Sequence, residues 1–231
     1  LAIGAIQFGL TYTCYFEAFQ YLHAHEVAIC AVTIPLYVTL MNDFHEGRLN
    51  RFALFTAALS VLGALIARDN PAHAMESLRG FLWIQVSNAC FAFGQLAYRR
   101  VRAQYPGWKD GQLSLYLFMG AFLMTALMVT LNNQWGELAL ISGVHWLVLG
   151  YLGAIGSGLA FFFWNKGAAQ TAPATLAVIN NLKVPLSIGV SLWIFGEQAN
   201  WVRLLLGGGL ITLAIILTQR HTRSRLRLAR A

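Results

Sequence analysis

Long apolar stretches set the strongest constraint on how this chain folds. Eight of them follow one another along 231 residues, each near the roughly 20 residues with which a helix crosses a bilayer. Apolar residues make up 58% of the chain and charged residues 11%, whereas soluble domains carry about 25% charged residues. The sequence therefore predicts an all-α polytopic membrane protein, with about eight transmembrane helices at 1–20, 26–45, 51–68, 80–98, 113–131, 145–165, 174–195 and 202–218.

An internal repeat appears when the chain is shifted by about 150 residues. Four anchors of the first copy return in the second: Ala24, Pro35, Leu36 and Glu46 as Ala174, Pro185, Leu186 and Glu197. Each copy is a helix, a short polar turn with a glutamate, and another helix, which indicates an internally duplicated membrane protein. The helices at 80–98 and 113–131 have no counterpart before the first copy. We therefore expect an N-terminally truncated fragment with two helices missing.

The basic residues predict the orientation of the helices. If the tail at 220–231 is cytoplasmic, twelve of the 16 Lys and Arg residues fall on the cytoplasmic side and three on the other, as the positive-inside rule requires. The two copies then run in opposite directions, an inverted repeat typical of secondary transporters. We expect a multi-pass protein of the cell (inner) membrane with a cytoplasmic C-terminus. The net charge of +7 reflects this topology and not a nucleic-acid partner.

The ordered motifs of the two copies resemble a known family. Each copy has an alanine-rich helix entry, a mid-helix proline, a glutamate opening the next helix, and small residues along that helix: 21–24, Pro35, Glu46 and Gly63, then 171–174, Pro185, Glu197 and 207–209. This order resembles the EamA-type transporters of the drug/metabolite transporter (DMT) superfamily. Complete members have five plus five helices, so the resemblance implies about eight helices here of an expected ten. It also implies transport of small organic solutes (amino acids, metabolites or drugs), with a bias toward export.

The same resemblance divides the chain into four parts. Residues 1–70 are expected to be the remainder of the first EamA-like repeat, 71–79 an inter-repeat loop, 80–219 the second repeat, and 220–231 a basic cytoplasmic tail.

Lys183 is the foremost candidate for solute binding, because a charge inside a transmembrane helix is costly and marks function. Asn180, Lys183, Ser187 and Ser191 follow at spacings of three and four, so they share one helix face. This face would bind an anionic or zwitterionic solute through the ammonium group. The alternative is that Lys183 pairs with an internal acid and stabilises the bundle. Two prolines, Pro35 and Pro185, are expected to act as helix hinges.

Glu17 is the second charge within a predicted span, at the end of a stripe formed by Gln7, Thr11, Cys14 and Glu17. It is a candidate coupling carboxylate, which would exchange a proton during transport. The alternative is that Glu17 reaches water at the end of its helix.

Two further groups are candidates for lining a solute cavity. Gln85 and Asn88 lie on one side of the helix at 80–98, and their alternative role is hydrogen bonding between helices. Tyr15 is suited to stacking on a solute, but aromatic residues also lie at the edges of the bilayer. The glycines at Gly150, Gly158 and 207–209 predict close helix packing.

Two enzyme motifs are incomplete in this sequence. His25-Glu26 lacks the second histidine of a zinc helix, because Ile29 occupies its position, and Ser157 has Ile155 where a nucleophile elbow needs glycine. We therefore predict no catalytic residue, metal site or cofactor. The predicted function is secondary transport by alternating access, with a small-molecule solute and the lipid bilayer as partners and a homodimer left open. The alternative is a non-transporting membrane subunit or a membrane enzyme acting on a lipid-like substrate.

Overall fold

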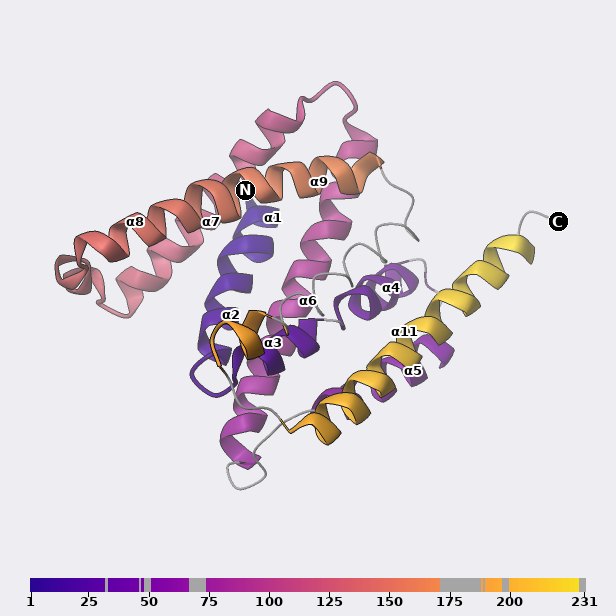
Figure 1. Ribbon diagram of the computed structural model, residues 1–231. Coiled ribbons are helices and arrows are strands. Elements are labelled where there is room, and N and C mark those ends of the chain that lie inside the picture. Colours follow the sequence, from indigo (N-terminus) through magenta and orange to yellow (C-terminus); the bar gives the residue numbers. More distant parts are fainter. Residues whose placement is uncertain are drawn as a thin grey trace.

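The computed structural model describes residues 1–31, 33–45, 47, 51–66, 74–170, 188, 190–196 and 200–228. Every regular element in these ranges is a helix, as the apolar stretches predict (Figure 1). In chain order they are α1 (Ala2–Gly4), η1 (Ala5–Leu10), α2 (Thr11–Ala18), α3 (Ala24–Ala31), α4 (Ile34–His45), α5 (Arg51–Ile66), α6 (Ala74–Gln104), α7 (Asp110–Leu131), η3 (Trp135–Leu140), α8 (Gly143–Tyr151), η4 (Leu152–Leu159), α9 (Ala160–Gln170) and α11 (Trp201–Leu228).

The first three elements form one continuous helix whose middle, η1, is a π-helix. Its wider turn shows in the bond that the backbone N–H of Thr11 donates to the carbonyl of Ile6, five residues earlier. A second π-helix, η4, interrupts the long helix formed by α8 and α9. Single π turns inside α-helices are rare and occur frequently at functional sites.

The second predicted span is divided into α3 and α4. The backbone N–H of His23 donates to the carboxylate of Glu26 at 3.0 Å, which satisfies one of the unpaired groups at the start of α3. Helix α3 ends at Ala31 and α4 begins at Ile34. Pro35 lies at this break, because proline has no N–H to donate to the carbonyl four residues earlier.

Helix α6 lies at the centre of the bundle, in contact with η1, α2, α3, α4 and α9 (Figure 1). Ile84 and Ala92 on this helix are fully buried. One apolar cluster joins Ile84 to Val27 and Ile211, and another joins Ala92 to further residues of η1, α4 and α7. Because α6 packs on several neighbours at once, it fixes the positions of the helices that surround the candidate site.

Glycines allow two helix pairs to approach closely. Gly4 lies against the backbone of Leu117, and Gly120 lies against the backbone of Leu1, so α1 and α7 pack through glycines on both sides. Helices α5 and α11 lie side by side, where a Cβ on Gly63 would be 2.8 Å from the carbonyl oxygen of Gly207 (Figure 1). This contact confirms the close packing predicted at Gly207. The same prediction is wrong at Gly208 and Gly209, where no described atom would lie within 4 Å of an added Cβ.

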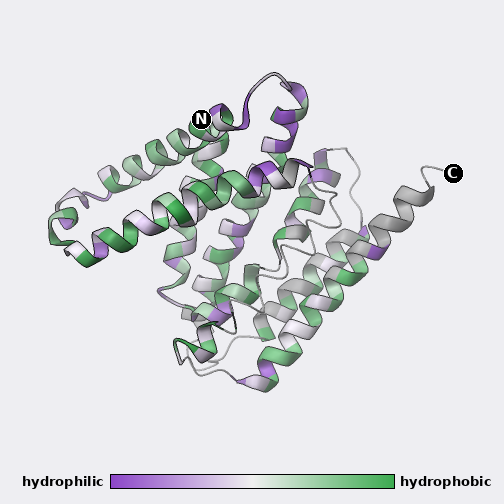
Figure 2. Ribbon diagram, turned by 45° about the horizontal axis from the view of Figure 1, so that its top comes forward, coloured by the Kyte–Doolittle hydropathy of each residue, from purple (hydrophilic) through white to green (hydrophobic). Residues whose placement is uncertain are grey.

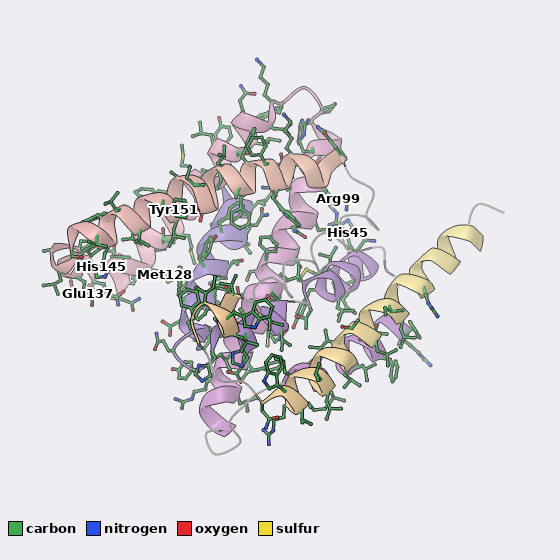
Figure 3. All side chains as sticks on the ribbon, viewed as in Figure 1. His45, Arg99, Met128, Glu137, His145 and Tyr151 are labelled. Atoms are coloured by element: carbon green, nitrogen blue, oxygen red, sulfur yellow. The ribbon has the colours of Figure 1, made fainter. Side chains whose placement is uncertain are left out.

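The hairpin of α7 and the α8–η4–α9 helix packs against α6 at α9, and its far end, where α7 leads into α8, extends away from α6 (Figure 1). Figure 3 labels Met128, Glu137, His145 and Tyr151 on it. The close packing predicted at Gly150 is wrong for the described residues, since none of their atoms would lie within 4 Å of a Cβ there. The Gly143–Gly167 stretch is apolar over 25 residues, and no part of its most apolar window is buried within the protein. Such a surface matches lipid and not water.

Within the described residues, three helical stretches are long and apolar enough to cross a membrane: Ala24–Asn42, Asp110–Leu131 and Gly143–Gly167. Hydrophilic residues gather at the turn between α6 and α7, and hydrophobic residues dominate the helix shafts (Figure 2). The chain is a helical membrane protein.

Candidate functional site

A cavity of about 570 Å³ lies between the N-terminal helix, α3, α4, α6, α9 and the segment 190–195. Most of the lining residues are buried or partly buried, Gln7 fully so, whereas Phe19 and Phe195 are 40% and 73% exposed. Its volume is within the range of small-molecule sites, which are about 300–1,000 Å³. The described part of the wall carries no Lys, Arg, Asp or Glu.

The polar part of the wall comes mainly from the N-terminal helix and α6. Ser87 Oγ donates to the carbonyl of Thr11 at 2.9 Å, which ties α6 to α2. Asn88 Nδ2 donates to the carbonyl of Cys30 at 2.8 Å and to Thr33 Oγ1 at 3.0 Å. Both amide hydrogens of Asn88 are therefore used within the protein, which leaves its carbonyl oxygen as the group it offers to a solute.

The aromatic part of the wall is centred on Phe161 of α9. The centroid of its ring lies 5.0 Å from the ring centroid of Phe8, 5.9 Å from that of Phe91 and 6.2 Å from that of Tyr12. Rings at these distances and at tilted angles pack favourably and present flat apolar faces. The cavity thus combines an aromatic wall with a few neutral polar groups, a combination typical of sites for small organic ligands.

The structure places the predicted site residues of the N-terminal half as follows. Tyr15 and Asn88 line the cavity. Gln85 lies between helices, with its Oε1 accepting from Thr33 Oγ1 and from Tyr37 Oη, both at 3.0 Å. Glu17 lies outside the cavity wall and accepts a hydrogen bond from Gln20 at 3.1 Å.

The predicted residues of the C-terminal half lie outside the described residues, namely Lys183, Asn180, Ser187 and Pro185. Ser191, the last member of the same predicted face, is described, and it is buried on the cavity wall.

Several wall residues were not assigned to a site from the sequence. Gln7 and Thr11 line the cavity and belong to the polar stripe that ends at Glu17, for which the sequence predicts a coupling role and not solute binding. The signal that points to them is the spacing of four between Gln7, Thr11 and Tyr15, which places the three on one helix face. Ser87, Phe91 and Phe161 carry no comparable sequence signal, because which face of each helix meets the cavity depends on packing.

Comparison with known proteins identifies the family. Residues 78–220 match the EamA-like transporter family. A probable biotin transporter of Pseudomonas aeruginosa is 38% identical over 216 residues, which cover 93% of this chain and 75% of the relative. This chain belongs to the EamA-like transporter family. A biotin transporter of Escherichia coli K12 is 32% identical over 95% of this chain and 73% of its own length, and one of Salmonella typhimurium is 33% identical over 91% and 70%.

A solved crystal structure shares the fold of this EamA-like transporter with a TM-score of 0.59, at 22% identity over 96% of this chain and 76% of the other. The family assignment makes the protein a membrane transporter of small solutes and decides against an enzyme or a non-transporting subunit. It also confirms the resemblance that the repeated motifs indicated. In this EamA-like transporter the described cavity is the candidate solute site.

Proposed function

We propose that this EamA-like transporter carries biotin across the cell membrane. The relatives named as biotin transporters motivate the choice of solute. The observation that carries the proposal is the cavity, whose aromatic wall suits the apolar ring system and alkyl chain of biotin and whose neutral polar groups suit its cyclic urea.

The carboxylate of biotin needs a cationic or hydrogen-bonding partner. Lys183, with Asn180 and Ser187 on the same predicted face, is the proposed partner. The position of Ser191 on the cavity wall supports this proposal, because Ser191 belongs to that face and follows Lys183 by eight residues. Tyr15 and Asn88 complete the proposed solute site, and Gln85 supports it by positioning Thr33 and Tyr37.

The proposed transport mechanism is alternating access between two inverted repeats, at 1–70 and 80–219. A loop at 71–79 joins the repeats, and a tail at 220–231 follows the second one. Two structural features support it. The π-helices at Ala5–Leu10 and Leu152–Leu159 begin 147 residues apart, close to the repeat shift of 150. Helices α5 and α11, which correspond under the same shift, lie side by side. Pro35 and Pro185 are the proposed hinges.

The remaining parts of the proposal come from the sequence. The chain forms about eight transmembrane helices, the C-terminus lies in the cytoplasm, and the membrane is the inner membrane. Glu17 is the proposed coupling carboxylate. Export of the solute and assembly as a homodimer stay predictions, which transport in inside-out vesicles and crosslinking in the membrane would measure.

The test is transport of radiolabelled biotin by proteoliposomes that contain the chain, with empty liposomes as the baseline. Wild-type flux above the baseline, lost in Lys183→Ala at equal protein content, is the expected result. Glu17→Gln should abolish only the dependence of flux on a proton gradient. Absence of biotin flux in the wild type would overturn the proposed solute, and unchanged flux in Lys183→Ala would remove that lysine from the site.

A further inference from the structure

Gln7 has an unusual environment for an amide side chain. It is fully buried on the wall of the cavity. Neither its Oε1 nor its Nε2 has a hydrogen-bond partner among the described residues. Buried polar atoms are nearly always hydrogen-bonded, because removing them from water without a partner is unfavourable. Because Gln7 lines the cavity, its two unpaired amide atoms indicate a partner that enters the cavity.

The surrounding helices hold this amide in place. On α6, Gly94 lies directly beside it, and a Cβ on Gly94 would come within 2.6 Å of Gln7 Cδ. On the same helix Ser87 Oγ donates to Thr11, and Asn88 Nδ2 donates to Cys30 and Thr33, so these hydrogens are not directed to Gln7. Gln7 thus lies on the wall of the cavity, on a π-helix that packs against α6 and α7.

We propose that Gln7 recognises the cyclic-urea edge of the solute, an inference that rests on the proposed transport of biotin. A primary amide presents an acceptor and a donor in one plane. A cyclic urea or lactam presents an N–H and a C=O in one plane, so two parallel hydrogen bonds form, N–H to Oε1 and Nε2 to O=C. A carboxylate offers acceptors alone and would leave Oε1 without a donor. The urea ring of the solute therefore binds at Gln7.

The experiment measures two quantities on the chain in lipid nanodiscs, the Kd for radiolabelled biotin and the midpoint of thermal unfolding. Gln7→Leu has a similar volume and no polar atom. It should raise Kd about ten- to a hundredfold, because the urea would be buried without its two partners. The unfolding midpoint should stay unchanged or rise, because the protein loses no hydrogen bond of its own. Ser114→Ala is the matched control, since Ser114 Oγ is also buried and unpaired among the described residues but lies outside the cavity wall. It should leave Kd unchanged.

Two competitors make the test specific to the urea. Desthiobiotin keeps the cyclic urea and lacks the sulfur ring, and 5-phenylvalerate keeps an alkyl carboxylate and lacks the urea. Desthiobiotin should displace biotin from the wild type far better than phenylvalerate does. In Gln7→Leu that difference should shrink at least tenfold.

The outcomes separate the two proposals. If the wild type binds no biotin, the proposed function fails, and this inference fails with it. If the wild type binds biotin and Gln7→Leu binds it equally well, with the same preference for desthiobiotin, the inference alone fails. A large fall in the unfolding midpoint of Gln7→Leu would show that Gln7 is bonded within the protein, which also overturns the inference.

Discussion

The hydroxyl of Tyr12 lies 3.1 Å from the hydroxyl of Ser157 and so joins two helices that are 145 residues apart in sequence. Tyr12 belongs to α2, and Ser157 belongs to the π-helix η4. One turn beyond Ser157, the ring of Phe161 packs against that of Tyr12. The bond thus lies where the C-terminal half of the described chain reaches the wall of the cavity.

Removing either hydroxyl should weaken the same contact. Tyr12→Phe and Ser157→Ala should each lower the free energy of unfolding by about 0.5–1.5 kcal/mol, the usual net contribution of one hydrogen bond. The double variant should lose no more than the larger single loss, because both substitutions remove one bond. Thermal unfolding of the four proteins in the same detergent measures this. Additive losses would show that the two hydroxyls do not interact.

The contact between α5 and α11 should tolerate no side chain at Gly63. Gly63→Ala would place a methyl group 2.8 Å from both the carbonyl oxygen of Gly207 and a side-chain carbon of Ile211, so the helices must separate. We expect a loss of about 1–3 kcal/mol, the usual cost of overpacking. On α11, Gly209→Ala is the control, because no described atom lies near the added methyl group. It should be neutral or stabilising by up to about 1 kcal/mol through helix propensity.

Gly94→Ala should act on the cavity through Gln7. The added methyl group would collide with the Gln7 side chain, so both the unfolding midpoint and biotin binding should fall. Adding Gln7→Ala to Gly94→Ala should restore the unfolding midpoint, because the collision is removed. Biotin binding should stay low, because the amide is absent. A double variant that recovers neither stability nor binding would show that Gly94 is needed for another contact.

The turn between α6 and α7 is stabilised by a small polar network. Arg102 Nε lies 3.0 Å from Asp110 Oδ1, the same oxygen accepts from Tyr98 Oη at 3.1 Å, and Arg102 donates to the carbonyl of Trp108 at 2.6 Å. Asp110→Asn should lower the unfolding midpoint by an amount that decreases in 1 M NaCl, because the partly exposed ion pair is screened by salt.

Tyr98→Phe is the comparison for that network. It removes one hydrogen bond and leaves the ion pair, so its effect on the unfolding midpoint should be independent of salt. If Asp110→Asn and Tyr98→Phe change the unfolding midpoint by amounts that depend equally on salt, the salt-sensitive effect does not come from the ion pair between Arg102 and Asp110.

Sequence patterns predicted the helices well because membrane helices depend on local composition. Each span must satisfy its backbone hydrogen bonds internally, so a run of about 20 apolar residues is sufficient to predict a helix. The stretch at 113–131 appears as Asp110–Leu131, and the stretch at 51–68 appears as Arg51–Ile66. The stretch at 80–98 is part of the longer helix Ala74–Gln104, because helical hydrogen bonding continues into polar residues beyond the bilayer.

The solute site was predicted less completely, because helical spacing identifies a polar face but not its neighbour. The stripe from Gln7 to Glu17 is a single face by spacing, yet Gln7 and Thr11 line the cavity while Glu17 bonds to Gln20. Gln85 and Asn88 are also on one face, and Asn88 lines the cavity, whereas Gln85 bonds to Thr33 in the turn between α3 and α4 and to Tyr37 of α4.

The sequence by itself determined that this protein is a helical membrane transporter and where most of its helices lie, because hydropathy and repeated motifs are properties of short segments. Only the tertiary structure decided which polar groups face a shared space. Gln7 lies unpaired at the cavity wall, where η1 packs against α6 at Gly94. Ser157 forms a hydrogen bond with Tyr12, where Phe161 of α9 lines the same wall. These contacts join residues up to 145 positions apart, so no local pattern specifies them.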